Sequence, residues 1–277
     1  MNPTMASPNF DAAECVRLPA SGSARVPKGV TTAWMQLRGT STVQCQEGTF
    51  LLRRGDWILL DGASQPRLQT DHLAICMGLY LPSNHAFYPG RGRMYLDEMQ
   101  IAVRLWRRTG VVPDGKVMAR EDLRPLVLLM ADLQRDIGLA ANRCPGRSIK
   151  QRAPLMATLQ RTRLYLEGHT LLDHSVDELA AFAGLPARYL SRVFHAVYGL
   201  SPLSFAGRVR LDHAVRLLRE GEMTVDQIAV TVGYKHRGTL LSALRAHLGL
   251  GRMDRIADVV GPSRPEVREL MLDVTVL

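Results

Sequence analysis

Long apolar runs and paired cysteines are both missing from this sequence of 277 residues. No apolar stretch approaches the ~18 residues that a bilayer-spanning helix needs, and the first thirty residues lack the continuous apolar core of a signal peptide. The cysteines are scattered without a CxxC pair, which favours free thiols in a reducing cytoplasm over disulfides or bound zinc. They are Cys15, Cys45, Cys76 and Cys144. We therefore expect a cytoplasmic protein that contacts no membrane.

Short signatures of common enzymes are also missing. The sequence contains no GxSxG, HExxH, Walker A or GxGxxG motif. It has no HxH pair either, and His72 and His85 lie thirteen residues apart, whereas a metal site needs several ligands that converge. We therefore expect no catalytic residue, no metal and no cofactor, and a protein that is not an enzyme.

The positive charge is unevenly distributed, although the net charge of +9 favours an anionic partner. Residues 168–277 hold 13 basic and 12 acidic side chains, while residues 1–167 hold 22 and 14. A basic tract that includes Arg161 and Arg163 comes at the end of this first part, where we expect a solvated helix face or a position near phosphates. The charge of the C-terminal part therefore does not indicate nucleic-acid binding, and only the order and spacing of its residues can.

That pattern begins at residues 175–199, which predict a helix-turn-helix. Ser175 and Glu178 form the S-x-x-E capping box of a helix start, and Gly184 permits the left-handed conformation that ends a helix. A second helix is expected over about 187–197, with one apolar face and one polar face. An arginine-bearing helix of this kind suits the major groove of DNA. Its outward residues are expected to be Arg188, Ser191, Arg192 and His195.

The unit recurs in residues 224–249, displaced by 49 positions before its turn and by 50 after it. Between the copies, Pro202–Glu220 predicts one helix with an apolar stripe, since proline suits a first helical turn. Such a connector would hold two recognition helices about 34 Å apart, one turn of DNA. The second unit's candidates for DNA contact are Arg237, Thr239, Ser242 and Arg245.

Three motifs give the span from about 159 to 251 a family resemblance. LAAFAGLPARYLSRVFHAVYGLSP, RVRLDHAVRLL and VDQIAVTVGY, in this order and spacing, resemble the DNA-binding domain of AraC/XylS-type transcription regulators. The resemblance implies two helix-turn-helix units. Pro186 stands where the family usually has a serine cap, and residues 238–242 and Arg252 also depart from its pattern. The second unit is therefore expected to read bases weakly or to contact mainly phosphates.

Residues 30–82 predict short strands separated by turn residues, typical of a small barrel or sandwich. This stretch resembles the cupin-like sensor domain of the same family, which implies a small-molecule effector. A barrel without metal can bind a small molecule in its mouth. The aromatic candidates for such a pocket are Trp34, Phe50, Trp57 and Tyr80, each of which could instead be a core residue.

The predicted fold is α+β, with a cupin-like β-barrel, a helical linker and an all-α domain of two helix-turn-helix units joined by a connecting helix. A loop is expected at Pro89–Gly92, and helices near 96–108, 121–139 and 155–166. The expected divisions are a flexible arm (1–29), an effector-binding domain (30–118), a linker and dimerisation region (119–168), a DNA-binding domain (169–251) and a tail (252–277).

The predicted function is sequence-specific transcription regulation on double-stranded DNA, and two alternatives remain open. A homodimer is expected, with RNA polymerase as a partner if the protein is an activator. The first alternative is a cupin-type enzyme with an appended helical domain, which would contain metal. The second is a protein-binding helical module, which would show neither sequence preference on DNA nor strong salt dependence.

Overall fold

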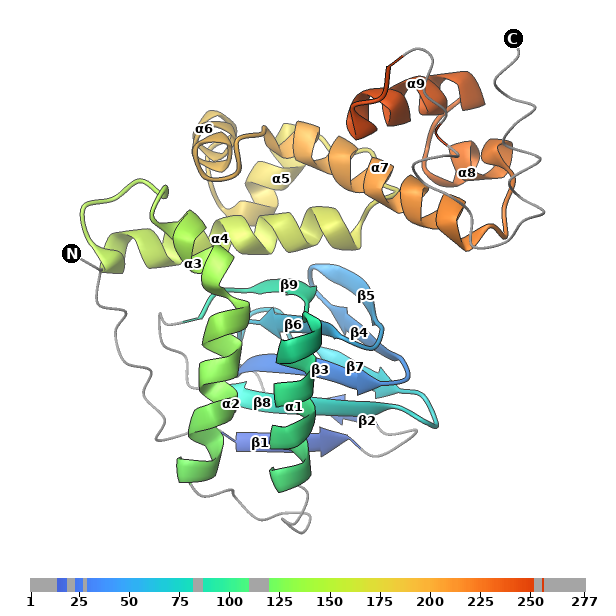
Figure 1. The fold of residues 1–277 in the computed structure, drawn as a ribbon. Coiled ribbons are helices and arrows are strands. Elements are labelled where there is room, and N and C mark those ends of the chain that lie inside the picture. Colours follow the sequence, from blue (N-terminus) through green and yellow to red (C-terminus); the bar gives the residue numbers. More distant parts are fainter. Residues whose placement is uncertain are drawn as a thin grey trace.

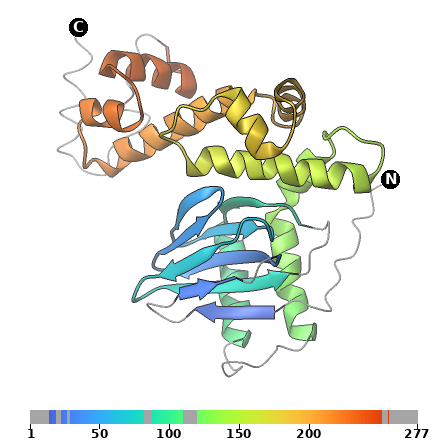
Figure 2. The ribbon, with the colours of Figure 1, turned by 180° about the vertical axis from the view of Figure 1, so that it is seen from behind.

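The strands come first along the chain and the helices follow, which confirms the predicted α+β class (Figure 1). The structure, a computed structural model, describes residues 14–18, 23–26, 29–81, 87–109, 120–251 and 256. Figure 2 shows from behind how the strands stack below the helical part of the molecule.

Two antiparallel sheets form the N-terminal part. The first has the order β1 (Glu14–Leu18), β8 (Ile75–Leu81), β3 (Thr31–Arg38), β6 (Asp56–Leu60) and β9 (Gly90–Arg93). The second has the order β2 (Ser23–Arg25), β7 (Arg67–Thr70), β4 (Ser41–Cys45) and β5 (Gly48–Leu52). The β5–β6 turn lies at Gly55, whose φ is 90°.

The core between the two sheets is built around Trp34. Its ring packs on the backbone of Gly78 in the neighbouring strand, where an added Cβ would lie 2.3 Å from the ring. Its indole Nε1 donates a hydrogen bond to Thr32 Oγ1 at 3.2 Å. The cluster draws on both sheets and also takes Leu164 from a helix, so sheets and helices share one core here.

Helices α1 (Leu96–Thr109) and α2 (Arg120–Leu133) lie side by side across the outer face of the five-stranded sheet (Figure 1). They cover the residues of that sheet that alternate with its inner ones, including Met35 and Trp57. The helix predicted over 121–139 is in fact divided into α2 and α3 (Arg135–Ala141), because the chain bends at Gln134.

Two N-terminal expectations were wrong. The stretch 1–29 was predicted to be a flexible arm, yet residues 14–18 and 23–25 are edge strands. Their main chains pair with β8 and β7, and main-chain hydrogen bonds form whatever the amino-acid composition of the stretch. Residues 1–13 lie outside the described residues. Pro89–Gly92 was predicted to be a loop, but β9 runs through it: Gly92 passes so close to Trp57 that a Cβ would lie 2.9 Å from its ring.

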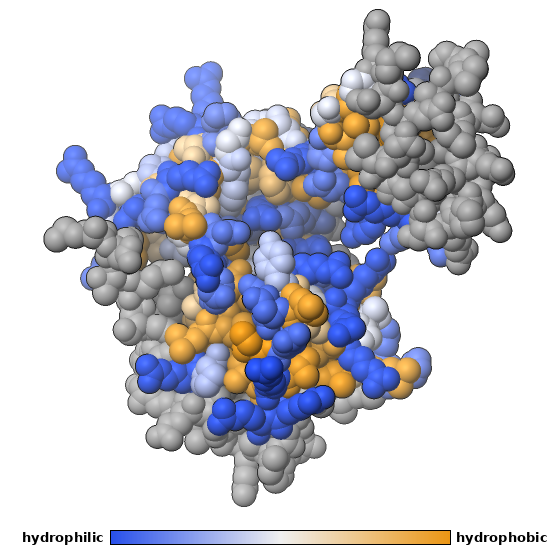
Figure 3. Space-filling view, viewed as in Figure 1, coloured by the Kyte–Doolittle hydropathy of each residue, from blue (hydrophilic) through white to orange (hydrophobic). Residues whose placement is uncertain are grey.

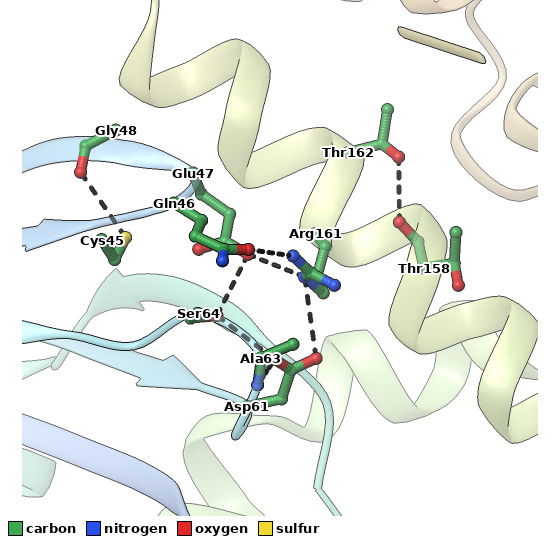
Figure 4. A network of polar contacts seen from close by, with 10 residues as sticks. All are labelled: Cys45, Gln46, Glu47, Gly48, Asp61, Ala63, Ser64, Thr158, Arg161 and Thr162. Atoms are coloured by element: carbon green, nitrogen blue, oxygen red, sulfur yellow. Dashed lines mark hydrogen bonds and ion pairs between the residues drawn. The ribbon is translucent and has the colours of Figure 1, made fainter. Parts of the chain in front are cut away.

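Helix α4 (Ile149–Gly168) crosses the end of the two sheets, and the C-terminal helices lie above it (Figure 1). Arg161 Nε lies 2.7 Å from Oε1 of Glu47, a carboxylate with no solvent exposure at the β4–β5 turn (Figure 4). Ser64 Oγ donates to the same oxygen at 3.0 Å. At the end of α4, Gly168 sits on the same turn, because a Cβ there would lie 2.2 Å from the carbonyl oxygen of Glu47.

Candidate nucleic-acid interface

The first helix-turn-helix forms as predicted, from α5 (Val176–Ala183) and α6 (Ala187–Tyr198). Ser175 Oγ accepts a hydrogen bond from the backbone nitrogen of Glu178 at 3.1 Å, and the Glu178 carboxylate accepts one from the backbone nitrogen of Ser175 at 2.9 Å. These bonds lower the pKa of Glu178. Gly184 ends α5 with a φ of 64°, so the turn has the geometry that the sequence predicts.

The polar face of α6 points away from the protein. Arg188, Arg192 and His195 are exposed, and Ser191 is half-buried. The guanidinium of Arg192 lies over the ring of Tyr189, 5.3 Å from its centroid. Neither Arg188 nor Arg192 forms an ion pair within the part of the chain that the structure describes. Two unpaired guanidinium groups on the outer face of this helix can therefore approach an external anion or base edge.

The connecting helix α7 has the predicted bounds, Pro202–Glu220. Ser201 caps it by accepting a hydrogen bond from the backbone nitrogen of Ser204 at 3.2 Å. Its buried stripe includes Ala214 and Leu218. Its solvent-exposed side carries Arg208, Asp212, Arg216 and Arg219.

The second unit consists of α8 (Val225–Thr231) and α9 (Arg237–Leu248), with a capping box between Thr224 and Gln227. Three of its four candidates, Arg237, Thr239 and Ser242, are exposed. Arg245 differs, because it is half-buried and its Nε is shielded from solvent without a hydrogen-bond partner among the residues that the structure describes. Arg237 Nη1 lies 3.6 Å from the carboxylate of Asp226, so its charge is partly offset within the unit.

The two units are packed in different ways. The buried residues of α5 and α6 belong to one continuous apolar cluster that reaches the outer face of the five-stranded sheet. The second unit has a separate cluster, built from α7, α8, α9 and Ile256. In Figures 1 and 2, α6 and α9 both lie at the end of the molecule farthest from the sheets, with α6 seen end-on and α9 crossing the view. The recognition helices are therefore not parallel.

Pro186 is the N-cap of α6 and offers no side-chain hydrogen bond to the helix. With a ψ of 137°, Pro186 already has the extended backbone conformation of a capping residue. We predict that the Pro186→Ser variant unfolds at higher denaturant than the Pro186→Ala variant, by about 1 kcal/mol in the free energy of unfolding. Alanine is the matched control because it removes the ring without adding a hydroxyl. Equal stability of the two variants in urea unfolding would contradict the prediction.

The four aromatic candidates for an effector pocket do not line one space. Trp34 and Phe50 are fully buried between the sheets, and Tyr80 packs on the same cluster, 6.2 Å from Trp34 between ring centroids. Trp57 faces the opposite side, against the helices, because successive residues of a strand alternate between faces and Ile58 takes the inner position. A pocket that uses all four side chains is therefore ruled out by the strand register.

The described ranges contain neither a cluster of metal ligands nor a helix that could span a membrane. No three His, Cys, Asp or Glu side chains among those residues gather closely enough to hold a metal ion. His72 is exposed, and His85 lies outside the described residues. In the same part of the chain, no helix has both the length and the apolarity required to cross a bilayer.

Taken together, two capped helix pairs, a connecting helix and an outward basic face define a double helix-turn-helix domain of the DNA-binding class. Residues 179–251 match the family model described as a helix-turn-helix domain. A putative AraC-like transcription regulator of Streptomyces lividans is 37% identical over 76 residues, which cover 27% of this chain and 25% of that protein. This C-terminal part is a DNA-binding domain of the AraC/XylS type.

Two further proteins are similar to parts of this chain. The HTH-type transcriptional regulator ExsA of Pseudomonas aeruginosa is 24% identical over 91 residues, covering 33% of each chain. A solved structure of ToxT from Vibrio cholerae covers 90% of this chain and 97% of its own, with 8% identity and a TM-score of 0.34. The chain thus spans a quarter to a third of the length of the curated relatives it matches.

Proposed function

We propose that the whole chain is a sequence-specific transcription regulator of the AraC/XylS type, which works in the cytoplasm by binding rather than by catalysis. The observation that carries the proposal is the outward face of α6, where Arg188 and Arg192 stand exposed and unpaired among the described residues on the second helix of a helix-turn-helix. A guanidinium can bond O6 and N7 of guanine together, so these two side chains are assigned to base contacts.

The remaining candidates take supporting roles in this proposal. Ser191 and His195 reach neighbouring bases or phosphates from the same face of α6. In the second unit, Arg237, Thr239 and Ser242 approach DNA from exposed positions, while half-buried Arg245 is left with a backbone contact at most. The amino ends of α5 and α8 can receive phosphates, since unpaired backbone N–H groups and the helix dipole favour anions there.

Selection of binding sites from random double-stranded DNA tests the proposal. We expect one strongly enriched half-site for α6 and a weaker one about 10–10.5 base pairs away. Binding without any enriched sequence would contradict the proposal. If that binding also depended little on salt, it would favour the protein-binding module instead. Elemental analysis of the purified protein tests the enzyme alternative, because a cupin-type enzyme would retain a metal.

The second unit supplies a separate prediction. Arg237→Ala is expected to lower the slope of log affinity against log salt by roughly 1 and to leave the selected sequence unchanged, since one phosphate contact is lost. The slope is measured by titrating labelled site DNA at several salt concentrations. Ser242→Ala, which removes no charge, is the control and should keep the slope. Loss of sequence preference in Arg237→Ala would show that α9 reads bases strongly.

The N-terminal part is proposed to be a cupin-like domain over 30–118 that binds a small-molecule effector, with a helical linker over 119–168 and a DNA-binding domain over 169–251. The two-sheet architecture with an aromatic core supports this division. For binding to count as regulation, the effector must favour one arrangement of the domains by a difference in affinity. RNA polymerase is a partner only if the protein is an activator.

Homodimerisation is assigned to the linker region and the helices beside it. Apolar residues gather over α1 and α2 on the face shown in Figure 3, and several are exposed there. Exposed apolar patches of this kind often mark protein contacts. They include Leu96, Ile101 and Leu128. Sedimentation of the full chain at micromolar concentration tests this, and a monomer at all concentrations would contradict it.

A further inference from the structure

A pocket of about 510 Å³ lies outside the core of the two sheets, where β9, α4 and α7 meet. One wall belongs to the sheets through Arg91, a second to α4 through Arg163 and Glu167, and a third to the connecting helix through Arg208 and Arg216. Figure 3 shows the molecule hollowed where α7 extends beyond the sheets, with hydrophilic side chains along the walls. The pocket therefore joins the two halves of the chain.

The charge of this pocket is unbalanced. Its lining has four arginines and two carboxylates, which leaves two positive charges in excess. Glu167 is shared, since its oxygens lie 2.8 Å from Arg163 Nε and 3.8 Å from Arg91 Nε. The other carboxylate, Asp212, accepts a hydrogen bond from His247 at 2.8 Å if that ring carries the proton.

Arg216 lies in an electropositive setting. Although its side chain is still solvent-exposed, partial desolvation lowers the pKa of Arg216, and the nearby guanidinium groups of Arg91 and Arg53 lower it further, against the opposing effect of Glu220 and Asp56. Arg53 itself is paired with Glu220 of α7 at 3.1 Å, so this carboxylate is already engaged. An external anion would relieve the repulsion between Arg91 and Arg216.

Two polar atoms in the lining have no hydrogen-bond partner in the part of the chain that the structure describes. Tyr198 Oη and His213 Nδ1 are shielded from solvent and have no hydrogen-bond partner among the described residues. Burial, and then the Arg216 charge, lower the pKa of His213, which keeps its ring neutral at pH 7. Buried polar groups without partners are costly, so a ligand or water that bonds them is expected. Apolar contact is offered beside them by Leu200, Phe205 and Val209.

We propose that this pocket binds a small organic anion with a doubly charged head group, such as a phosphate monoester or a dicarboxylate, attached to an apolar ring. The head group bonds Arg91 and Arg216, and the ring packs against Phe205 and Val209. Two charges match the excess in the lining, and planar guanidinium groups bond such oxyanions in pairs.

The consequence for regulation rests on the proposed function. Arg91 belongs to β9 and Arg216 to α7, so an anion that bonds both fixes the connecting helix against the sheets. Because α7 carries the second helix-turn-helix, the anion selects one placement of α9 relative to α6. Its occupancy would then change the affinity for DNA by the same factor by which DNA changes the affinity for the anion.

The test is calorimetric titration of the full chain without DNA, at constant ionic strength and in buffer free of phosphate. The probes are phenyl phosphate, isophthalate, benzoate and inorganic phosphate. Phenyl phosphate and isophthalate are expected to bind about tenfold or more tightly than benzoate, because a charge-assisted contact is lost with the second charge. Inorganic phosphate is expected to bind more weakly than phenyl phosphate, because it lacks the ring.

Variants of α7 make the test specific. Arg216→Gln should weaken binding of phenyl phosphate about tenfold or more, whereas Arg219→Gln, an exposed arginine of the same helix that does not line the pocket, should leave it unchanged. Arg208→Gln is the second pocket variant, used if Arg216→Gln unfolds at lower temperature than the wild type. Equal weakening in pocket and control variants, or no binding of either dianion up to about 10 mM, would overturn the proposal.

The outcomes separate this inference from the proposed function. Binding of the dianions by a chain that selects no DNA sequence would support the anion-binding pocket and contradict the proposed function as a regulator. Selection of a DNA sequence by a chain that binds neither dianion would do the reverse. If both hold, phenyl phosphate should change the affinity for the selected site in the wild type and not in Arg216→Gln.

Discussion

Arg192→Ala is expected to weaken binding to the selected DNA site by about 1–3 kcal/mol, roughly five- to 150-fold, and to relax base preference at one position. The side chain is exposed on α6 and has no ion-pair partner among the described residues, so its loss should leave the fold intact. The measurement is a titration of the selected site and of its single-base variants, with the free energy of unfolding determined in parallel.

Arg192→Lys is the matched variant for this position. Lysine keeps the charge but cannot bond O6 and N7 in the paired geometry of a guanidinium. It should therefore retain the salt dependence and still lose the base preference. Unchanged preference in Arg192→Ala would reduce Arg192 to a phosphate contact, and an equal loss of stability and affinity would make it a structural residue stacked on Tyr189.

Arg161→Met is expected to lower the free energy of unfolding by about 3 kcal/mol, because removing one partner of a buried ion pair strands the other charge. Glu47 has no solvent exposure and depends on Arg161 and Ser64 for its hydrogen bonds to Oε1. The Arg161 side chain is 23% exposed, which places the expected loss at the lower end of the range for fully buried pairs. Urea unfolding followed by tryptophan fluorescence measures it.

A double variant distinguishes the stranded charge from lost packing. Glu47→Gln combined with Arg161→Met removes both charges and should recover a large part of the loss. Arg135→Met, at an exposed arginine of α3 whose partner Asp132 is also exposed, is the control and should cost well under 1 kcal/mol. A loss below about 1 kcal/mol in Arg161→Met, or no recovery in the double variant, would show that the pair does not hold α4 to the sheets.

The sequence predicts best those elements whose signals are local. The bounds of α7 and the capping box of α5 follow from proline, serine and a partner three residues on, all of which act within one helical turn. The outward face of α6 follows likewise from helical periodicity. Helix ends and faces are fixed by neighbours in the chain, so they can be read without knowing the tertiary structure.

Features that depend on distant residues were missed. Arg161 was expected in a solvated or phosphate-facing tract, yet it bonds Glu47, 114 positions away. Gly90 and Gly92 were expected in a loop because glycine signals turns, but here they allow β9 to pass over Ile137 and Trp57. The dianion pocket gives no sequence signal either, since its lining residues come from positions 91 to 216 and only the fold brings them together.

The separate apolar clusters of the two helix-turn-helix units imply different protection of their amide hydrogens. Amides of α6 should exchange with solvent only when the cluster that includes the five-stranded sheet opens, whereas those of α8 and α9 can exchange through a smaller local opening. The recognition helices are not parallel, so one unit must turn before both can enter successive major grooves. The second unit, α8 and α9, is the one free to turn, because its apolar cluster is separate. Truncation after α7 would accordingly leave a folded N-terminal part with a single helix-turn-helix unit.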